Sequence, residues 1–356
     1  MSDGQTERAL TDEALGVVLP RFDLGRVRSV RRVPHGLIHV TFKVESDRGD
    51  FCLQALHSNL SGPSIQADYE VVTTRLAEAH FPAPKLIADR DGILWQDVGD
   101  RTWRCITWID GKTLSDRPTP EQAREAAQLL GRFYEVMLGL DYRFQSTHPL
   151  HRIDHHRQAF VDALDTAQGQ CDPWFESVQS LETRILDGVE RNRLPDDLPM
   201  WVVHGDPKFT NILFDESNRA VALVDLDTCG RHTILVDIGD AIRSWGLAGA
   251  DDDCRGFRLD VVESAFDGYR RGGLVLTDRE AALVASSGAL ISWELASRFA
   301  RDVVEDRYFG WDASRYESRR HHNLARAEAM VILAEAMESA LDEVHEAAVR
   351  MLAGGR

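Results

Sequence analysis

Long apolar runs are absent from this chain of 356 residues. No stretch approaches the roughly 18 consecutive apolar residues that a membrane-spanning helix needs. The first residues, Met1 to Arg8, also lack the basic-then-apolar order of a secretory signal. We therefore expect a protein that does not associate with membranes.

Basic residues are scarce relative to acidic ones, with 41 Lys and Arg against 58 Asp and Glu and a formal net charge of −17. Proteins whose main partner is a nucleic acid need a basic surface that displaces counterions, so we exclude that class. An acidic cleft would suit a cationic amine, whereas acidic surface charge often serves solubility alone, so charge does not identify a substrate. We expect the acidic run from Asp251 to Asp253 to be a solvated loop.

Paired cysteine spacings are missing as well. The five cysteines are scattered along the chain: Cys52, Cys105, Cys171, Cys229 and Cys254. This odd number without a paired spacing argues against a disulfide framework and a zinc site. A reducing cytoplasm is the expected location.

Two kinds of hydrophobic pattern divide the chain. Strands are expected at 27–33, 38–45, 51–56, 93–98 and 102–108, with a helix at 64–79. Long amphipathic helices are expected at 120–140, 174–192, 258–271, 278–305 and 323–352. The chain is long enough to form two units. We therefore predict an α+β fold with a β-rich unit at residues 1–108 and a mainly helical unit at 109–356.

The most informative segment is residues 202–214, VVHGDPKFTNILF, because Asp206 and Asn211 stand five residues apart in its loop. A second apolar run follows and ends at Asp225. Phosphoryl transfer depends on placing a metal, the phosphates and the attacking oxygen. Asp206 can accept the proton of an alcohol, while Asn211 and Asp225 offer the hard oxygen ligands that Mg²⁺ prefers. Lys208 is placed to reach the transferred phosphate as a point charge.

A purely structural interpretation competes with this one. Gly-Asp-Pro is a common turn sequence, and an Asn can simply open a strand. The second acid, at the end of another apolar run, favours the catalytic interpretation. The apolar runs on both sides of the loop predict two strands that form a hairpin beneath it, and His204 is expected to hold the loop by hydrogen bonds.

On these residues the chain resembles the aminoglycoside phosphotransferase-like kinases, relatives of protein kinases that phosphorylate small molecules. Asp206, Asn211 and Asp225 fall on the matching positions. The resemblance implies a two-lobed protein-kinase-like fold, with ATP and Mg²⁺ as cofactors and a small-molecule hydroxyl as acceptor. Asp227 is a further candidate metal ligand. Residues 225–228 and 236–243 resemble the branch that contains N-acetylhexosamine 1-kinases, which phosphorylate the anomeric hydroxyl of a sugar.

One position departs from this pattern. Residues 51–56 resemble the strand where most kinases carry a phosphate-binding Lys, but this chain has Gln54, a neutral amide that supplies no charge. The phosphate-contacting residue is therefore open. Gly36 is a candidate for a phosphate-covering hairpin, although a plain turn explains a single glycine equally well. Thr107 and Ile109 are assigned to the connection between lobes, where backbone groups can bind the adenine edge.

Four side chains are candidates for the acceptor site: Arg243, Trp293, Glu294 and Arg298. An aromatic face can stack on sugar C–H groups and a carboxylate can accept hydroxyl hydrogen bonds, while core packing is the alternative for Trp293. Arg243 either recognises a polar substituent or braces Asp237 and Asp240 by bidentate pairing, and we expect the bracing role.

Two other polar groups have competing interpretations. Asp68 and Glu70, on the helix expected after Gln54, either pair with a basic group or are solvated helix charges. Four histidines between residues 148 and 156 lack the spacing that places two metal ligands on one helical face. We expect these histidines to form a loop that leads into a helix.

The sequence thus predicts an ATP-dependent kinase that acts on a hydroxyl of a hexose or N-acetylhexosamine, at the anomeric position. One alternative acceptor is an aminoglycoside, an amino alcohol or a homoserine-like molecule. A further alternative is a nucleotide-binding scaffold without turnover, which Gln54 suggests. The oligomeric state and the choice between ATP and GTP stay open at this stage.

Overall fold

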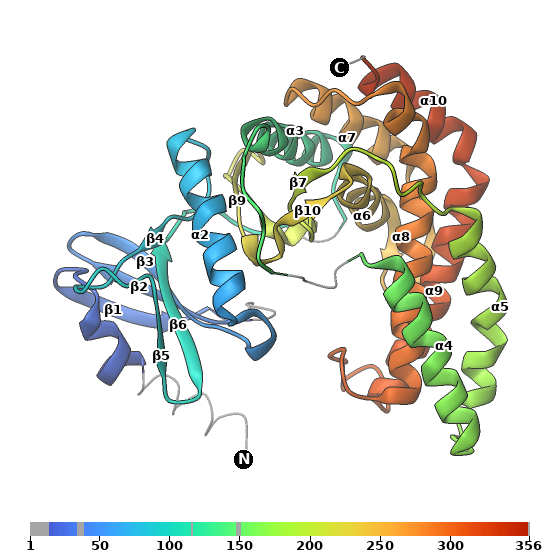
Figure 1. The fold of residues 1–356 in the computed structure, drawn as a ribbon, viewed down its shortest axis with the longest axis horizontal. Helices are drawn as coiled ribbons and strands as arrows, with labels where there is room; N and C mark the ends of the chain where they lie inside the picture. Colours follow the sequence, from blue (N-terminus) through green and yellow to red (C-terminus); the bar gives the residue numbers. More distant parts are fainter. Residues whose placement is uncertain (1–13, 34–38, 115–116, 147–150, 355–356) are drawn as a thin grey trace. The chain divides into compact units, whose positions relative to one another are not determined.

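The computed structural model of the protein describes residues 14–33, 39–114, 117–146 and 151–354. The chain forms two compact units, neither of which is continuous in sequence (Figure 1). The N-unit consists of Met1–Gly111, Asp141–Thr147 and Ala222–Cys229, and the C-unit consists of Lys112–Leu140, His148–Val221 and Gly230–Arg356. The N-terminal region is built on a β-sheet and the C-terminal part is mainly helical, which confirms the predicted α+β class.

A six-stranded antiparallel sheet forms the frame of the N-unit. Its strands are β1 (Val27–Arg32), β2 (Val40–Ser46), β3 (Gly49–Ala55), β4 (Leu86–Ile87), β5 (Trp95–Val98) and β6 (Arg101–Thr107). The order is β1-β2-β3-β6-β4, and β5 also pairs with β6. Phe42, Val44, Leu53 and Trp103 form the core of this unit. β6 is therefore central, with β3, β4 and β5 as its partners.

Helix α2 (Pro63–Glu78) connects β3 to β4. Pro63 occupies its first turn, where a missing N–H costs nothing and the fixed φ suits a helix. The helix buries a polar as well as an apolar face, including Gln66, Asp68 and Tyr69. It also packs against the short turn η5 (Leu226–Thr228) of the same unit. This contact brings residues far apart in sequence next to each other.

The described part of the C-unit is arranged around one long helix, α8. Its helices are α3 (Pro120–Met137), α4 (Ile153–Gly169), α5 (Phe175–Arg191), α6 (Ile234–Gly246), α7 (Leu259–Arg271), α8 (Asp278–Glu305), α9 (Arg319–Ser339) and α10 (Leu341–Leu352). α8 packs against α4, α5, α6, α9 and α10 (Figure 1). A capping box between Thr277 and Glu280 begins α8 at the predicted residue.

Several local predictions differ from the structure. The helix expected at 323–352 begins earlier, at Arg319, and Ala340 interrupts it with a non-helical backbone, so it forms α9 and α10. The hairpin expected beneath the loop is also wrong. β7 (Trp201–Val203) pairs with β10 (Gly230–His232), and β8 (Ile212–Phe214) pairs with β9 (Ala220–Leu223). The partner of β7 follows β8 and β9 in the sequence, so the local pattern around β7 cannot identify it.

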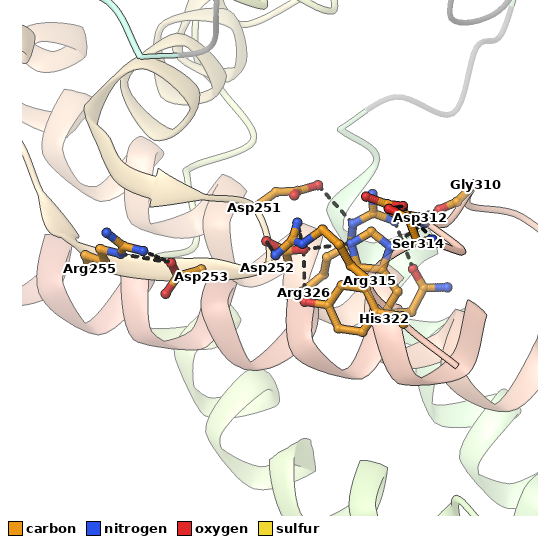
Figure 2. Close-up of polar contacts among 12 residues, drawn as sticks. Asp251, Asp252, Asp253, Arg255, Gly310, Asp312, Ser314, Arg315, His322 and Arg326 are labelled. Atoms are coloured by element: carbon orange, nitrogen blue, oxygen red, sulfur yellow. Dashed lines mark hydrogen bonds and ion pairs between the residues drawn. The ribbon is translucent and has the colours of Figure 1, made fainter. Parts of the chain in front are cut away.

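The acidic run at 251–253 is not simply a solvated loop. Asp251 and Asp252 form the turn between β11 (Leu247–Ala250) and β12 (Asp253–Phe257) (Figure 2). The side chain of Asp252 is 0% exposed. Asp252 accepts hydrogen bonds from Tyr316 Oη at 2.9 Å and His322 Nε2 at 2.9 Å, and Arg315 pairs with it at 2.8 Å. His322 Nδ1 accepts from the Asp312 N–H at 3.1 Å, so both ring nitrogens are engaged. The cluster is therefore a set of hydrogen bonds and one arginine ion pair that fastens the first turn of α9 and the chain before it to the hairpin.

The described residues contain five free cysteines, in line with the absence of a disulfide framework. None of the helices in the described ranges has the combined length and apolarity that crossing a bilayer requires.

Candidate active site

One buried carboxylate, that of Asp237, anchors the start of the loop between β7 and β8. Asp237 on α6 is 0% exposed and accepts the backbone N–H groups of His204 at 2.6 Å and Gly205 at 2.9 Å. It also accepts the hydroxyl of Tyr134 at 3.1 Å. Gly205 has φ 87°, a conformation that favours glycine. Burial raises the pKa of Asp237, while His204 and the two N–H donors oppose that rise. The start of the loop is thus fixed by an internal polar anchor.

Asp206, Lys208 and Asn211 come together on this loop. Lys208 Nζ lies 2.7 Å from Asp206 Oδ2, and their side chains are 34% and 14% exposed. Asn211 Nδ2 donates to the carbonyl of Asp206 at 2.9 Å and lies 3.4 Å from its Oδ2. Trp245 Nε1 donates to the Pro207 carbonyl at 3.1 Å, which fixes the loop from another side. Asp206 is thus a partly accessible carboxylate with the ammonium group of Lys208 beside it.

His204 has the internal role expected of it. Its side chain is buried, and its Nδ1 accepts the N–H of Asp206 at 3.3 Å. A buried imidazole that holds the backbone of the next-but-one residue limits the positions that Asp206 can adopt.

Asp225 lies in the N-unit, at the end of β9, with the left-handed backbone angles φ 62° and ψ 56°. A non-glycine residue in this region is uncommon, and such strain persists only where the surroundings enforce it. Strained backbone is often found at functional sites. Asp206 and Asn211 belong to the C-unit, so the predicted convergence of the three side chains on one cation stays a prediction.

Asp227 is bound on both of its oxygens. Arg104 reaches Oδ1 through Nη1 and Oδ2 through Nη2, each at 2.6 Å, and His39 Nε2 lies 3.2 Å from Oδ2. His39 Nδ1 accepts the N–H of His57 at 3.1 Å, which leaves the proton on Nε2 for Asp227. Burial acts to raise the pKa of Asp227, but Arg104 and His39 outweigh it and hold that pKa well below its usual range. This geometry favours Asp227 as an anchor of its segment over Asp227 as a metal ligand.

The predicted nucleotide contacts are distributed as follows. Gln54 Oε1 accepts from Arg104 Nε at 2.9 Å. The N–H of Thr107 donates to the Lys85 carbonyl at 2.9 Å, so that donor is already used within the sheet. Ile109 follows the end of β6, outside any strand, where backbone groups can serve a ligand. Gly36 lies outside the described residues.

Three of the four acceptor candidates are part of ionic contacts. Arg243 donates to Asp240 through Nε at 3.0 Å, the bracing role that was expected, although Asp237 is not its partner in that bond. Glu294, 1% exposed on α8, lies 3.1 Å from His151 Nδ1 and 3.6 Å from Arg298 Nη1. Burial acts to raise the pKa of Glu294, but His151 and Arg298 outweigh it and lower that pKa to about 2.

Trp293 is part of the core. Its side chain is 0% exposed, its Nε1 lies 3.0 Å from Glu338 Oε1, and its ring packs against Gly188 of α5. Core packing, the alternative to stacking on a sugar, is therefore what the structure shows for Trp293.

Sequence reasoning assigned no role to Arg104, and it left Asp68 without a partner. Asp68 accepts the hydroxyl of Tyr142 at 2.8 Å and the backbone N–H groups of Gln145 at 2.9 Å and Ser146 at 2.7 Å. It therefore fastens residues 142–146 to α2, where a pairing with a basic group had been one of the two interpretations. The partners of Asp68 are more than 70 residues away, so no local signal in the sequence identifies them.

Asn211 and Asp225 each carry an oxygen atom of the kind that a hard divalent cation binds. Asn211 donates through its amide nitrogen to Asp206, so its carbonyl oxygen is the atom it can offer a metal. Asp225 adds a carboxylate from the end of β9. Amide and carboxylate oxygens are ligands that Mg²⁺ accepts, with its other positions left to phosphate and water.

The chain is similar to several kinases. A homoserine kinase from Rhodospirillum rubrum is 25% identical over 240 residues, which are 67% of this chain and 71% of that protein. A solved microcompartment-associated aminopropanol kinase has a TM-score of 0.63 and 17% identity, over 94% of this chain and 98% of its own. An amicoumacin kinase, solved in complex with AMP-PNP, Ca²⁺ and Ami, has a TM-score of 0.60 and 13% identity, over 93% of each chain.

The two solved structures share the fold that the sequence predicts. The sequence pattern of the family described as "Phosphotransferase enzyme family" matches residues 29–274, a span that contains Asp206, Asn211 and Asp225. The match covers more than half of the described chain, and we conclude that this chain belongs to the phosphotransferase enzyme family.

Proposed function

We propose that this phosphotransferase transfers the γ-phosphate of ATP to a hydroxyl of a small molecule that also carries an amine. The observation that carries the reaction type is the arrangement of Asp206, Lys208 and Asn211 on a loop fixed by Asp237. A carboxylate that is 14% exposed, beside a lysine and an amide, suits the placement and charge stabilisation that phosphoryl transfer requires.

In this proposal the acceptor oxygen forms a bond to the γ-phosphorus as the bond to the β-phosphate oxygen breaks. Asp206 orients the acceptor hydroxyl and takes its proton. Lys208, already 2.7 Å from Asp206, offsets the charge that develops on the transferred group. Asn211 and Asp225 are the residues proposed to hold Mg²⁺, which neutralises phosphate charge when it is bound.

Three considerations support an amine-bearing acceptor. The homoserine kinase and the aminopropanol kinase to which the chain is similar are named for substrates that carry an amine. The net charge of −17 is favourable for a cation. The sugar hypothesis rests on the resemblance of short segments, mainly residues 225–228 and 236–243, and Trp293, which was a candidate for stacking on a sugar, is 0% exposed. We therefore rank the amine-bearing alcohol above the hexose or N-acetylhexosamine.

Replacement of Asp206 and Asp225 tests the assigned roles. We expect Asp206→Asn to lower kcat by roughly 10²- to 10⁴-fold while nucleotide binding is largely kept, because the lost group acts on the proton. Asp225→Ala is expected to weaken binding of the magnesium nucleotide. Steady-state kinetics and calorimetric titration with AMP-PNP measure both. Loss of nucleotide binding in Asp206→Asn would make Asp206 a ligand, and unchanged titration of Asp225→Ala would refute its metal role.

The acceptor is tested by coupled ADP release with a panel of substrates. Homoserine, aminopropanol and ethanolamine represent the amine class, and glucose and N-acetylglucosamine represent the neutral sugars. We expect turnover with a member of the amine class and none with the sugars. Turnover with the sugars alone would reverse our ranking. Nucleotide binding without turnover of any acceptor would support a nucleotide-binding scaffold.

We also expect ATP as the phosphate donor. The five free cysteines support the cytoplasm as the expected location.

A further inference from the structure

Arg104 is a buried cation with an unusually complete set of partners. Its side chain is 1% exposed, and that of Asp227 is 0% exposed. Besides its two bonds to Asp227, it donates to Gln54 Oε1 at 2.9 Å and lies 3.3 Å from Gln66 Oε1. Its guanidinium stacks on the ring of Tyr69 at 3.9 Å. β3, β6, α2 and η5 therefore all meet at this one side chain.

A buried ion pair is poor evidence of added stability. The desolvation of two charges offsets much of their attraction, and apolar replacements of such pairs are often neutral or stabilising. What the bidentate pair does supply is geometry, because the planar fork of Arg104 admits Asp227 in one orientation. The three-residue turn η5 is thereby fixed to β6.

Asp225 lies between two attachments of this kind. Before it, the Leu223 N–H donates to the Pro82 carbonyl at 3.1 Å. After it, Asp227 is held by Arg104. These two attachments hold Asp225 in a left-handed backbone conformation that is uncommon outside glycine. The direction of the Asp225 carboxylate thus depends on the pair.

The partner of Arg104 across the sheet explains the residue at position 54. Gln54 on β3 stands opposite Arg104 on β6 in the strand register. Its carbonyl oxygen accepts a guanidinium N–H, a role that a Lys cannot fill because an ammonium only donates. A Lys at 54 would also set a second positive charge against Arg104. The neutral Gln54 is therefore suited to the buried charge next to it.

We propose that Arg104 is a positioning residue that fixes Asp225 for metal binding, and that the buried cation of this region sits on β6 at Arg104 instead of on β3 at position 54. The proposal rests on the function proposed above. Arg104 acts through Asp227 and does not itself touch the metal or the nucleotide. Its loss is therefore expected to affect the metal-bound nucleotide selectively.

The test is calorimetric titration of AMP-PNP into Arg104→Lys, with and without MgCl₂. Lys keeps the charge but cannot form the fork, so we expect affinity for the magnesium nucleotide to fall roughly 10- to 100-fold, as for other residues that support metal ligands. Affinity for the metal-free nucleotide should stay within about twofold of wild type. The Mg²⁺ concentration that gives half-maximal turnover should rise. Arg101→Lys is the matched control, because Arg101 lies on the same strand, is 30% exposed and is expected to leave all three measurements unchanged.

A folding defect is separated from this effect by a second variant and by thermal unfolding. Arg104→Gln combined with Asp227→Asn removes both charges together and leaves no unpaired buried charge. We expect the same selective loss in that folded double variant. Unchanged magnesium-nucleotide affinity in either folded variant would overturn the proposal, and so would an equal loss for the metal-free nucleotide. Failure of wild type to bind any nucleotide would instead refute the proposed function.

Discussion

Glu294 illustrates how much a buried carboxylate depends on its immediate neighbours. His151, His156 and Arg298 surround it, at distances of 3.1, 3.4 and 3.6 Å. Burial acts to lower the pKa of His151, but its contact with Glu294 outweighs burial and raises that pKa. The cluster fastens the start of α4 to the middle of α8. Two of the four clustered histidines, His151 and His156, thus have a buried acid as their partner.

This cluster predicts a pH-dependent contribution to stability. The pKa of Glu294 lies at about 2 against an ordinary 4.5, a gap worth about 3 kcal/mol. A lowered carboxyl pKa gives stability that is complete above pH 4.5 and lost as pH falls from 4.5 towards 2. The raised pKa of His151 acts oppositely: its contribution is complete below pH 6.5 and lost as pH rises through the folded value.

We expect Glu294→Gln to lower the free energy of unfolding by about 3 kcal/mol near pH 6, because buried cations lose their partner. The difference from wild type should shrink below pH 4.5. Urea unfolding at several pH values between 7 and 3 measures it. Glu335→Gln is the control, since its exposed pair with Arg184 is worth at most about 1 kcal/mol. A deficit that stays constant across this pH range would contradict the assigned ionisation.

At the scale of elements, the contact between α5 and α8 depends on a missing side chain. A Cβ at Gly188 would stand 2.2 Å from Cε2 of Trp293. Trp293 is fully buried and bonded to Glu338, so it cannot easily move away. The two helices therefore approach closely at this point.

Gly188→Ala is accordingly expected to lower the free energy of unfolding by about 1–3 kcal/mol through overpacking. Gly169→Ala, in the last turn of α4, is the matched comparison, because nothing lies within 4 Å of its added methyl group. It should be neutral or stabilising by up to about 1 kcal/mol through helix propensity. Urea titrations of both variants decide the matter. Equal stability of Gly188→Ala and wild type would show that the helices separate at little cost.

Short stretches of sequence predict some of the helices and strands, whereas the pairing of others depends on distant residues. The start of α8 follows from Thr277 and Glu280, which cap it three residues apart. Asp206 and Asn211 share one loop, so the sequence reveals their proximity directly. The strand pairing of β7 could not be foreseen in this way, because its partner β10 follows after two other strands. Pairing over such separations is decided by tertiary packing.

At the scale of the whole molecule, the sequence predicts the α+β class and the kinase-type motif. It does not predict the buried polar contacts between distant residues. Arg104 and Asp227 are 123 residues apart. Asp252 lies in an acidic run that suggests solvent, yet donors from residues 315–322 cover it (Figure 2). Local patterns report which residues are apolar or charged. They do not report which distant charge will neutralise a buried one.

The discontinuous N-unit has a consequence for how the protein is made. Its last segment, Ala222–Cys229, carries the carboxylate that neutralises Arg104. A nascent chain of 111 residues already contains every strand of the six-stranded sheet but lacks this partner. The N-unit can therefore complete its buried core only after translation has passed residue 229, when much of the C-unit has already been synthesised.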